Sequence, residues 1–166
     1  MINTIQFKKC DPSDFEHFYR LRCEENNICW TGWDAPPNYE HLQKWFLSNL
    51  MRHDRTIFLA YETCYKLTYG YLYIDRVAKQ VFAISYAVSD KYRNNGIGTK
   101  IIQFATTYVL QNLQPNSKII AKVAENNIAS ISALLKNNYP PTNEWEMGFF
   151  RKSGLSVKMQ FYEYKK

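Results

Sequence analysis

The sequence predicts a mixed α/β fold of the α+β type, with about four helices flanking a central mixed, mostly antiparallel sheet of seven strands. Some apolar stretches alternate with period 2, and others recur at helical spacing. Three strand patterns follow one another closely in the middle of the chain, which favours antiparallel hairpins. The 166 residues suit a single domain spanning residues 1–166.

Seven segments have the pattern of strands. The first alternates Ile5 and Phe7 with polar neighbours, and residues 81–88 are apolar on both faces, as in a buried strand. Short connections over residues 62–66 and 76–80 favour hairpins on either side of the third strand. The predicted strands cover residues 3–9, 56–61, 67–75, 81–88, 118–124, 144–151 and 157–164.

Four segments are predicted as helices because their apolar residues recur every three or four positions. Asp11 can cap the first helix, and Pro12 suits its first turn. Pro115 ends the third helix, and Asn138 suits a left-handed position after the fourth. The helices are expected from about residue 11 to between 24 and 27, from 38 to 50, from about 96 to before 115, and from about 127 to 137.

Aromatic residues make up 16% of the chain, and two groups of them are candidates for a ligand cleft. Residues 28–37 contain Trp30 and Trp33 around a glycine and end in two prolines, which predicts a loop. The tryptophans either stack on a sugar or base, with Asp34 facing an amine or hydroxyl, or they cover the core. Three tyrosines of the third strand share one face, either as core or as a cleft wall. They are Tyr69, Tyr71 and Tyr73.

The composition limits the classes of ligand. The 21 basic and 15 acidic residues give a net charge of +6, which suits an anionic nucleotide coenzyme, whereas their dispersion disfavours nucleic acid. The four cysteines form no Cys-x-x-Cys pair and the three histidines lack metal-ligand spacing, so no metal is expected. Without a signal-like segment or an apolar run of membrane length, we expect a cytoplasmic protein with reduced thiols and no membrane partner.

The segment over residues 92–100 carries the strongest functional signal. Gly96 and Gly98 lie on a turn from a buried strand into a helix. Such a turn directs unpaired amides and the positive end of the helix dipole at one point, which makes a phosphate site. Glycine is needed there because a Cβ would keep phosphate oxygens away from the amides. The alternative interpretation is a helix cap without a ligand.

The spacing within this turn distinguishes among phosphate-binding motifs. A dinucleotide fingerprint would have a third glycine where Ile101 stands, and in a P-loop the lysine would precede the hydroxyl residue rather than follow Thr99. The pattern Arg-x-x-Gly-x-Gly, at Arg93, Gly96 and Gly98, resembles the pyrophosphate motif of the GNAT superfamily of acyl-CoA-dependent N-acyltransferases.

A second segment is similar to the same family. Asn127 and Ser130 stand where the family has asparagine and a small residue, and Asn138 and Tyr139 stand where it has glycine and phenylalanine. The resemblance covers residues 79–139 in sequence. The predicted order of elements also resembles the GNAT fold over the whole chain, so the resemblance implies that fold.

The resemblance implies that the chain takes acetyl-CoA as acyl-donor cosubstrate and transfers the acetyl group to a primary amine by direct attack in a ternary complex. The loop amides would hold the pyrophosphate, and the edge of the strand over 81–88 would hold the pantetheine. The thioester would then lie between this strand and the strand over 118–124. The implied cofactor-binding residues are Tyr86, Ala87, Val88, Arg93, Asn94, Asn95, Gly96, Ile97, Gly98, Thr99, Asn127 and Ser130.

The sequence departs from the family at the general acid. Many members have a tyrosine where this chain has Leu134. Either water protonates the departing thiolate, since a thiol has a pKa of about 8.5, or another hydroxyl does so. The candidate hydroxyls are Ser85, Tyr139 and Tyr86. An attacking ammonium must also lose a proton, and Glu125 at a strand end is the first candidate base. The other candidates are Asp75, Glu144 and Glu146.

The predicted partner is a small-molecule amine, bound by Trp30, Trp33 and Asp34. The segment around the tryptophans looks like that of family members that acetylate nucleotide-linked amino sugars. One alternative is a protein or peptide amine, which predicts a long open groove between this segment and the final hairpin. Others are a CoA-binding regulator without turnover and a nucleic-acid binder. A monomer or a homodimer is expected.

Overall fold

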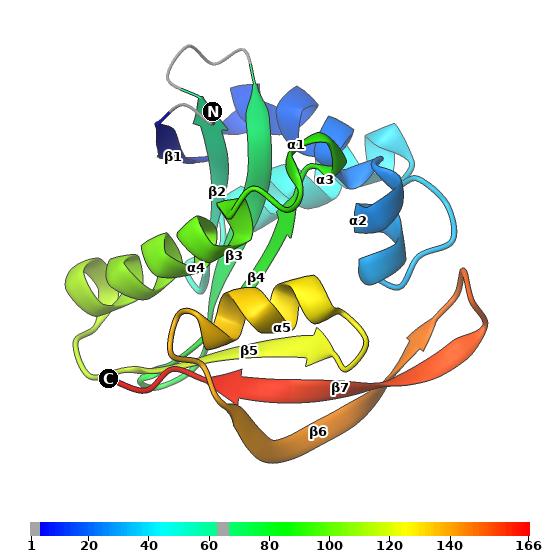
Figure 1. Cartoon of the computed structure of the whole chain (residues 1–166). Helices are drawn as coiled ribbons and strands as arrows, with labels where there is room; N and C mark the ends of the chain where they lie inside the picture. The colour runs from blue at the N-terminus through cyan, green and yellow to red at the C-terminus, as the bar shows by residue number, and fades with distance from the viewer. Residues whose placement is uncertain (1–3, 63–66) are drawn as a thin grey trace.

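The strands of the described chain form one seven-stranded sheet in the order β1-β2-β3-β4-β5-β7-β6 (Figure 1). The computed structural model describes residues 4–62 and 67–166, so residue 3 and most of the predicted 62–66 connection, with Cys64, lie outside the described residues. Neighbouring strands are antiparallel except β4 and β5, which are parallel. The predicted mixed, mostly antiparallel sheet is therefore confirmed. The strands are β1 (Ile5–Lys9), β2 (Arg55–Glu62), β3 (Thr68–Ala78), β4 (Val81–Val88), β5 (Lys118–Ala124), β6 (Pro141–Phe150) and β7 (Leu155–Glu163).

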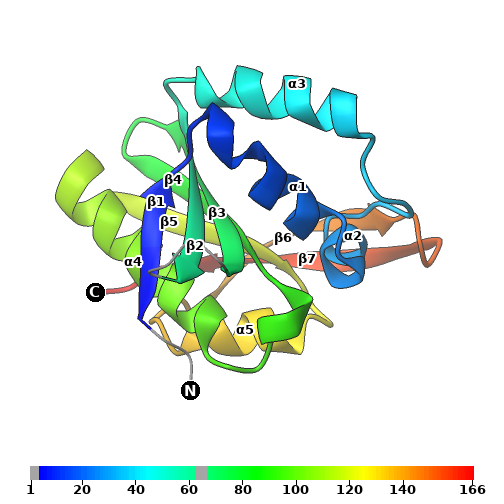
Figure 2. The same ribbon diagram turned by 90° about the horizontal axis from the view of Figure 1, so that it is seen from above.

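Helices cover both faces of the sheet (Figure 2), with α1 and α3 packed on one face and α4 and α5 on the other. The predicted cap is present at Asp11, whose side chain accepts a hydrogen bond from the Ser13 amide. The helices are α1 (Phe15–Arg22), α2 (Glu25–Trp30), α3 (Tyr39–Leu50), α4 (Ile97–Tyr108) and α5 (Ile128–Leu135). Shorter turns are η1 (Pro12–Asp14), η2 (Asp90–Tyr92) and the π-helical η3 (Val109–Leu113).

Each face of the sheet packs its own apolar core. Phe18 of α1 and Phe46 of α3 are fully buried on one face, where the Phe18 ring contacts both Phe46 and Tyr71. Ile101 of α4 and Leu134 of α5 are fully buried on the other face. Burying such a side chain contributes about 1.5–3 kcal/mol. Leu134 therefore has a packing role at the position where many GNAT members carry their tyrosine.

The predicted shared face of the three β3 tyrosines is wrong at Tyr69. The register between β2 and β3 shifts between Ala60 and Tyr61, and such a bulge inserts one residue and reverses which face the next side chain takes. Tyr69 joins the core under α4, whereas Tyr71 and Tyr73 join the core under α1 and α3.

The predicted loop over residues 28–37 is wrong in its first part, where α2 continues to Trp30. The local sequence is a poor helix former, but contacts with a distant segment hold this helix. The Glu24 carboxylate accepts hydrogen bonds from the Ser89 hydroxyl (2.8 Å) and the Asp90 amide (2.7 Å). The start of α2 is thereby tied to the turn that follows β4, which is information that a local pattern does not contain.

The central pair of strands separates partway along its length. In the described sheet, β4 pairs with β5 over its first three residues, ending with Ala83 opposite Ile120. Both strands continue, β4 to Val88 paired with β3 and β5 to Ala124 paired with β7. Figure 1 shows the two strands diverging, with β5 below α5 and β4 rising above it. The second half of β4 consequently has a backbone edge without a strand partner on its β5 side.

Asp75, one of the candidate bases, is part of the framework on β3. Arg55 on β2 binds it with two parallel hydrogen bonds, one of them 2.8 Å from Nη2 to Oδ2, and also donates to Asn49 Oδ1 at 2.9 Å. Both charged side chains are only 18% exposed. The carboxylate is thus held by a bidentate ion pair and has a structural role.

We expect Asp75→Asn to lower the free energy of unfolding by about 1–3 kcal/mol, because it leaves a mostly buried guanidinium without its charged partner. The matched control is Asp54→Asn, which breaks the more exposed pair with Arg52 and should have a smaller effect. Urea titrations of the two variants measure the difference. Equal destabilisation would contradict the structural role of Asp75.

Candidate active site

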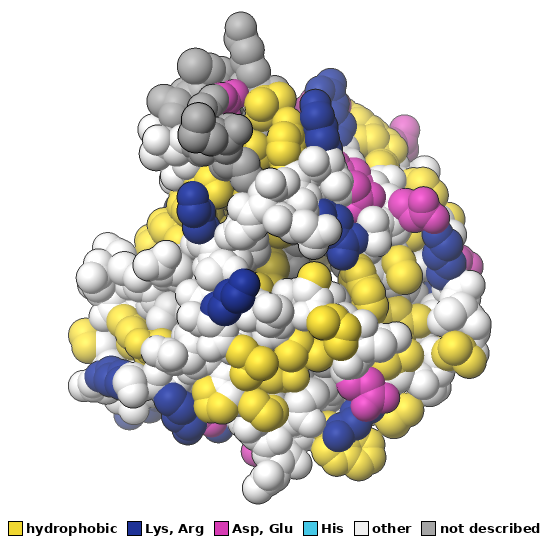
Figure 3. All heavy atoms as spheres, in the orientation of Figure 1, with side chains coloured by type: hydrophobic (Ala, Val, Ile, Leu, Met, Phe, Trp, Pro, Cys, Tyr) yellow, Lys and Arg dark blue, Asp and Glu magenta, His cyan; other side chains and the backbone are white. Residues whose placement is uncertain are grey.

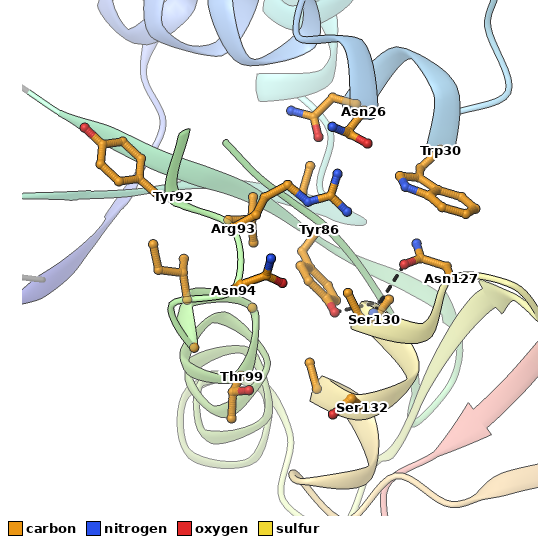
Figure 4. A pocket seen from close by; sticks show the side chains of 18 of the residues that line it. Asn26, Trp30, Tyr86, Tyr92, Arg93, Asn94, Thr99, Asn127, Ser130 and Ser132 are labelled. Carbon is orange, nitrogen blue, oxygen red and sulfur yellow. Dashed lines mark hydrogen bonds between the residues drawn. The ribbon is translucent and has the colours of Figure 1, made fainter. Parts of the chain in front are cut away.

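A cavity of about 360 Å³ opens where β4 and β5 part. Its wall comes from α2, β3, β4, the turn from η2 into α4, and α5, as Figure 4 shows at close range. The predicted site residues that line it are Trp30, Tyr86, Ala87, Val88, Arg93, Asn94, Gly96, Ile97, Gly98, Thr99, Asn127 and Ser130. Segments far apart in sequence therefore meet at this cavity: Asn26 lines it, and the Asn26 amide donates to Asp90, 64 residues further along the chain.

The edge of β4 presents backbone groups to this cavity. The Ser89 amide donates to the Tyr69 carbonyl of β3 at 2.8 Å. Because backbone groups alternate in direction along an antiparallel strand, those of Ala87 also face β3, and those of Tyr86 and Val88 face the gap beside β5. This edge can pair with an extended polar ligand in the manner of an added strand.

The glycine turn forms the second part of the site. Gly96 has φ of 75°, a left-handed conformation that favours glycine, and caps α4. The backbone hydrogen bond from the Lys100 amide to the carbonyl of the N-cap residue Gly96, 3.1 Å long, opens the helix. The amides of Ile97, Gly98 and Thr99 come before Lys100 in the first turn of α4, and they have no backbone acceptor within the helix. With the positive end of the helix dipole, they form a cradle that fits a phosphate group.

Gly98 lies where this cradle meets β4. A Cβ at Gly98 would lie 3.2 Å from Cε2 of Tyr86 and 3.7 Å from a Val88 methyl group. Any larger side chain would therefore fill the space between the helix N-terminus and the open strand edge. The absence of a side chain at this position keeps the phosphate cradle continuous with the cavity.

A hydrogen-bonded group of polar side chains lines the α5 side of the cavity. The Tyr86 hydroxyl lies 2.9 Å from the Ser130 hydroxyl, and Asn127 Oδ1 accepts from the Ser130 amide at 3.3 Å (Figure 4). Burial raises the pKa of Tyr86 to about 12, so its phenol stays protonated at neutral pH. Tyr86 thus offers a proton-bearing oxygen inside the cavity.

Several predicted site residues lie elsewhere. Tyr139 is fully buried in the core with its hydroxyl 2.7 Å from Thr106 Oγ1, so it packs the fold and does not reach the cavity. Ser85 is exposed on β4 outside the lining. Asn95 is exposed and donates to the Arg93 carbonyl at 3.0 Å, which supports the turn from behind. Glu125 is exposed at the end of β5, again outside the lining.

The second predicted tryptophan also differs from expectation. Trp33 is 48% exposed, and the Arg151 guanidinium lies 4.4 Å from its ring centre. Asp34 is exposed beside it, and neither residue lines the cavity. Nothing in the spacing of the two tryptophans shows that α2 carries Trp30 inward and the following bend carries Trp33 outward.

Other residues line the cavity that were not predicted as site residues, and they come from α2, β3, η2 and α5. Asn27 is buried and donates from Nδ2 to the Leu21 carbonyl at 2.7 Å. Asn26 and Thr31 come from the same segment. Tyr71 of β3, which the sequence already suggested as core or cleft wall, also lines the cavity. For Asn26, Asn27 and Thr31 the only sequence signal was their proximity to Trp30, because the contact between α2 and the turn after β4 is long-range.

Two negative findings concern the described residues alone. No group of three or more His, Cys, Asp or Glu side chains there could hold a metal ion. None of the helices in that part of the chain has the length and apolar character needed to cross a bilayer.

Comparisons with known proteins agree with this geometry. Residues 5–139 match the family described as "Acetyltransferase (GNAT) domain". Spermidine N-acetyltransferase from Vibrio cholerae in complex with CoA and spermine is similar in structure, with TM-score 0.81, 13% identity, and coverage of 96% of this chain and 95% of that chain. The protein yncA from Salmonella typhimurium, solved with its cofactor acetyl-CoA, gives TM-score 0.76 and 13% identity, covering 98% and 94%. No curated protein matches the chain in sequence.

The chain belongs to the GNAT acetyltransferase family, since the match covers residues 5–139 of 166. It is an N-acetyltransferase that uses acetyl-CoA as acyl donor. The structural likenesses, at 13% identity, show the GNAT fold. The phosphate cradle at the N-terminus of α4 and the open β4 edge fit the two polar parts of CoA, its diphosphate and its amide-bearing pantetheine arm.

We expect Gly98→Glu to raise the dissociation constant of CoA at least about 100-fold, because a carboxylate in the cradle removes two or more charge-assisted hydrogen bonds. Calorimetric titration with CoA measures this change. The matched control is Gln103→Glu, which adds the same charge to α4 at an exposed position outside the cavity. Equal CoA affinity in the two variants would contradict the placement of the diphosphate.

Proposed function

We propose that the cavity between β4 and β5 is where the acetyl group passes from acetyl-CoA to the primary amine of a small acceptor. The observation that carries the proposal is the continuity of three features: the α4 amides, the unpaired β4 edge and the space beyond Ala83. Acetyl-CoA would supply an activated acyl carbon. The residues of the chain would fix its position and exclude water.

Each part of the wall has a separate proposed role. The amides from Arg93 to Thr99 hold the diphosphate at the positive end of α4. The backbone groups of Tyr86 and Val88 bind the pantetheine arm and, where an amide faces the acyl carbonyl, stabilise its developing negative charge. Asn127 fixes the start of α5 and presents its amide nitrogen beside Ser130.

Tyr86 is the proposed hydrogen-bond donor to the departing sulfur. Among the three hydroxyl candidates named from the sequence, Tyr86 lines the cavity, whereas Ser85 and Tyr139 do not. Its hydroxyl is already oriented by Ser130. Because Leu134 fills the usual position of the tyrosine with a buried apolar side chain, this pair of hydroxyls takes over the contact with the sulfur.

A small acceptor is favoured by contacts between α2 and the β6–β7 hairpin. The Arg151 amide donates to the Gly32 carbonyl at 3.2 Å, and the rings of Trp30 and Phe150 meet edge to face at 6.2 Å. Lys152 pairs with Glu25 of α2 at 2.6 Å. These contacts close the space between residues 25–32 and the β6–β7 hairpin. A peptide substrate would need an open groove there. They support a small acceptor over a protein side chain or terminus.

A nucleotide-linked amino sugar remains our first acceptor to test. Trp30 offers a ring to a sugar or base at the cavity wall. The Lys and Arg side chains are spread over the face shown in Figure 3 and do not gather into a stripe. That distribution suits a discrete anionic ligand better than a nucleic-acid strand.

The direct test is a screen for CoA thiol release from acetyl-CoA with nucleotide-linked amino sugars, free amino sugars, amino acids, peptides and polyamines. The proposed function predicts release that depends on the amine and an acetamide product in equal amount. Tight CoA binding with no release for any amine would instead support the regulator without turnover.

We expect Tyr86→Phe to lower kcat about 100-fold with little change in the KM for acetyl-CoA, because the hydroxyl acts on the departing sulfur and not on the bound coenzyme. Tyr164→Phe is the matched control, since the Tyr164 ring packs at a tilt against Tyr139, and neither residue lines the cavity. Steady-state kinetics at saturating acceptor measures both. A rise in KM alone, with kcat unchanged, would assign Tyr86 to binding.

A further inference from the structure

The cavity has an unusual set of ionisable groups. Among the described residues that line it, none is Asp, Glu or His. Its ionisable side chains are Tyr71, Tyr86, Tyr92, Arg93 and Lys136. An alkyl ammonium must lose a proton before its nitrogen can attack a carbonyl carbon, and enzymes ordinarily supply a carboxylate or imidazole for this step. This wall supplies neither.

The two carboxylates nearest to the lining, Glu24 and Asp90, face the turn after β4 and are not among the residues that line the cavity. Both oxygens of Glu24 accept hydrogen bonds, from the Ser89 hydroxyl and the Asp90 amide. Burial raises the pKa of Glu24, which is the direction that a base needs, but its oxygens face the turn after β4. Asp90 Oδ2 accepts from the Asn26 amide at 3.3 Å, whereas its Oδ1 is buried without a hydrogen-bond partner among the described residues and lies 3.9 Å from Arg93 Nη1.

The remaining acidic groups around the opening face outward. Glu25 is exposed and paired with Lys152. Asp34 is exposed in the bend after α2, and Glu125 is exposed at the end of β5. Tyr71 is the ionisable group at the β3 wall, and burial raises the pKa of its phenol. It stays protonated and cannot accept a proton from the acceptor.

The charged side chains that line this space, Arg93 and Lys136, are both positive. Arg93 extends across the cavity toward Asn26 and Trp30 (Figure 4). Behind the β3 wall, Arg22 donates to the Tyr73 hydroxyl at 3.3 Å, and its Nε is buried without a hydrogen-bond partner among the described residues. The whole chain carries a net charge of +6. An ammonium group, and a polycation above all, is therefore disfavoured in this site.

We propose that the acceptor is an amine already substantially unprotonated at neutral pH and carrying no second positive charge, so that no side chain of the enzyme acts as the base. The inference rests on the proposed function and specifies its substrate class. An amine beside electron-withdrawing oxygen or carbonyl groups, as in an amino sugar or an α-amino compound, belongs to this class. A polyamine does not.

The step balances without an enzyme base. The neutral amine forms a bond from its nitrogen to the acyl carbon, and the carbon–sulfur bond breaks with its electron pair on sulfur. One of the two protons on nitrogen leaves, and one proton arrives on sulfur through the hydroxyl pair of Tyr86 and Ser130. An amine and a thioester give an amide and a thiol, with no net proton taken up by the protein.

The size of the effect follows from the acid–base equilibria. An α-amino group with a pKa of about 7.8 is roughly 10% unprotonated at pH 7, whereas an alkyl amine with a pKa of about 10.4 is unprotonated to only about 0.04%. The free-base concentration thus differs about 300-fold at equal total amine. Lower basicity weakens the nucleophile, which offsets part of this advantage.

The experiment compares amines of different basicity in one thiol-release assay between pH 6 and 10. Nε-acetyl-lysine amide and Nα-acetyl-lysine amide are isomers with the same charge, one with a free α-amine and one with a free alkyl amine. UDP-glucosamine and spermidine extend the series. We expect kcat/KM at pH 7 to favour the less basic amines by about 100-fold. The profile should rise with unit slope up to the pKa of each acceptor.

Glu24→Gln, Asp90→Asn and Glu125→Gln then test for a base in the protein. A substitution that disturbs the fold lowers kcat/KM at every pH. We nevertheless expect the inflection of the plot of kcat/KM against pH to stay at the pKa of the acceptor. Preference for spermidine at pH 7, one inflection common to all acceptors, or its loss in one variant would overturn the inference while leaving the proposed function intact. Absence of thiol release with every amine would instead reject the proposed function, and this inference with it.

Discussion

The separation of β4 from β5 is the constraint on which the rest of the site depends. A strand in the middle of a sheet normally has both backbone edges paired. Here β4 pairs with β5 only as far as Ala83 in the described sheet, and its second half keeps one free edge. Because β4 pairs with β3 and β5 pairs with β7, hydrogen bonds on the outer sides of both strands hold them apart at the gap.

Two further features bring the phosphate cradle and α2 to this gap. The left-handed Gly96 starts α4 immediately beside the end of β4, so the positive end of the helix points at the open edge. Glu24 ties α2 to Ser89 and Asp90 just after the same strand. One turn therefore holds both the phosphate cradle and the helix that carries Trp30. A disturbance of this turn would alter the coenzyme end and the acceptor end together.

The features that could be predicted from the sequence are those determined by residues close to one another in the chain. The seven strands, the four principal helices and the left-handed Asn138 follow from periodicity and turn chemistry, and the structure confirms them. The glycine turn and Asn127 could be selected because each needs a particular residue type. The helix α2, the inward turn of Trp30 and the burial of Tyr139 could not, since each depends on contacts with residues remote in sequence, such as the 65-residue separation between Glu24 and Ser89.

The most direct test is to measure amide hydrogen exchange with and without CoA, because the exchange rate reports on the individual backbone amides that are proposed to bind the coenzyme. We predict slower exchange on CoA addition at Ile97, Gly98 and Thr99 and at the free edge residues Tyr86 and Val88, with little change in β1 and α3. CoA binding that leaves the exchange of these amides unchanged would contradict the account and place the coenzyme elsewhere on the fold.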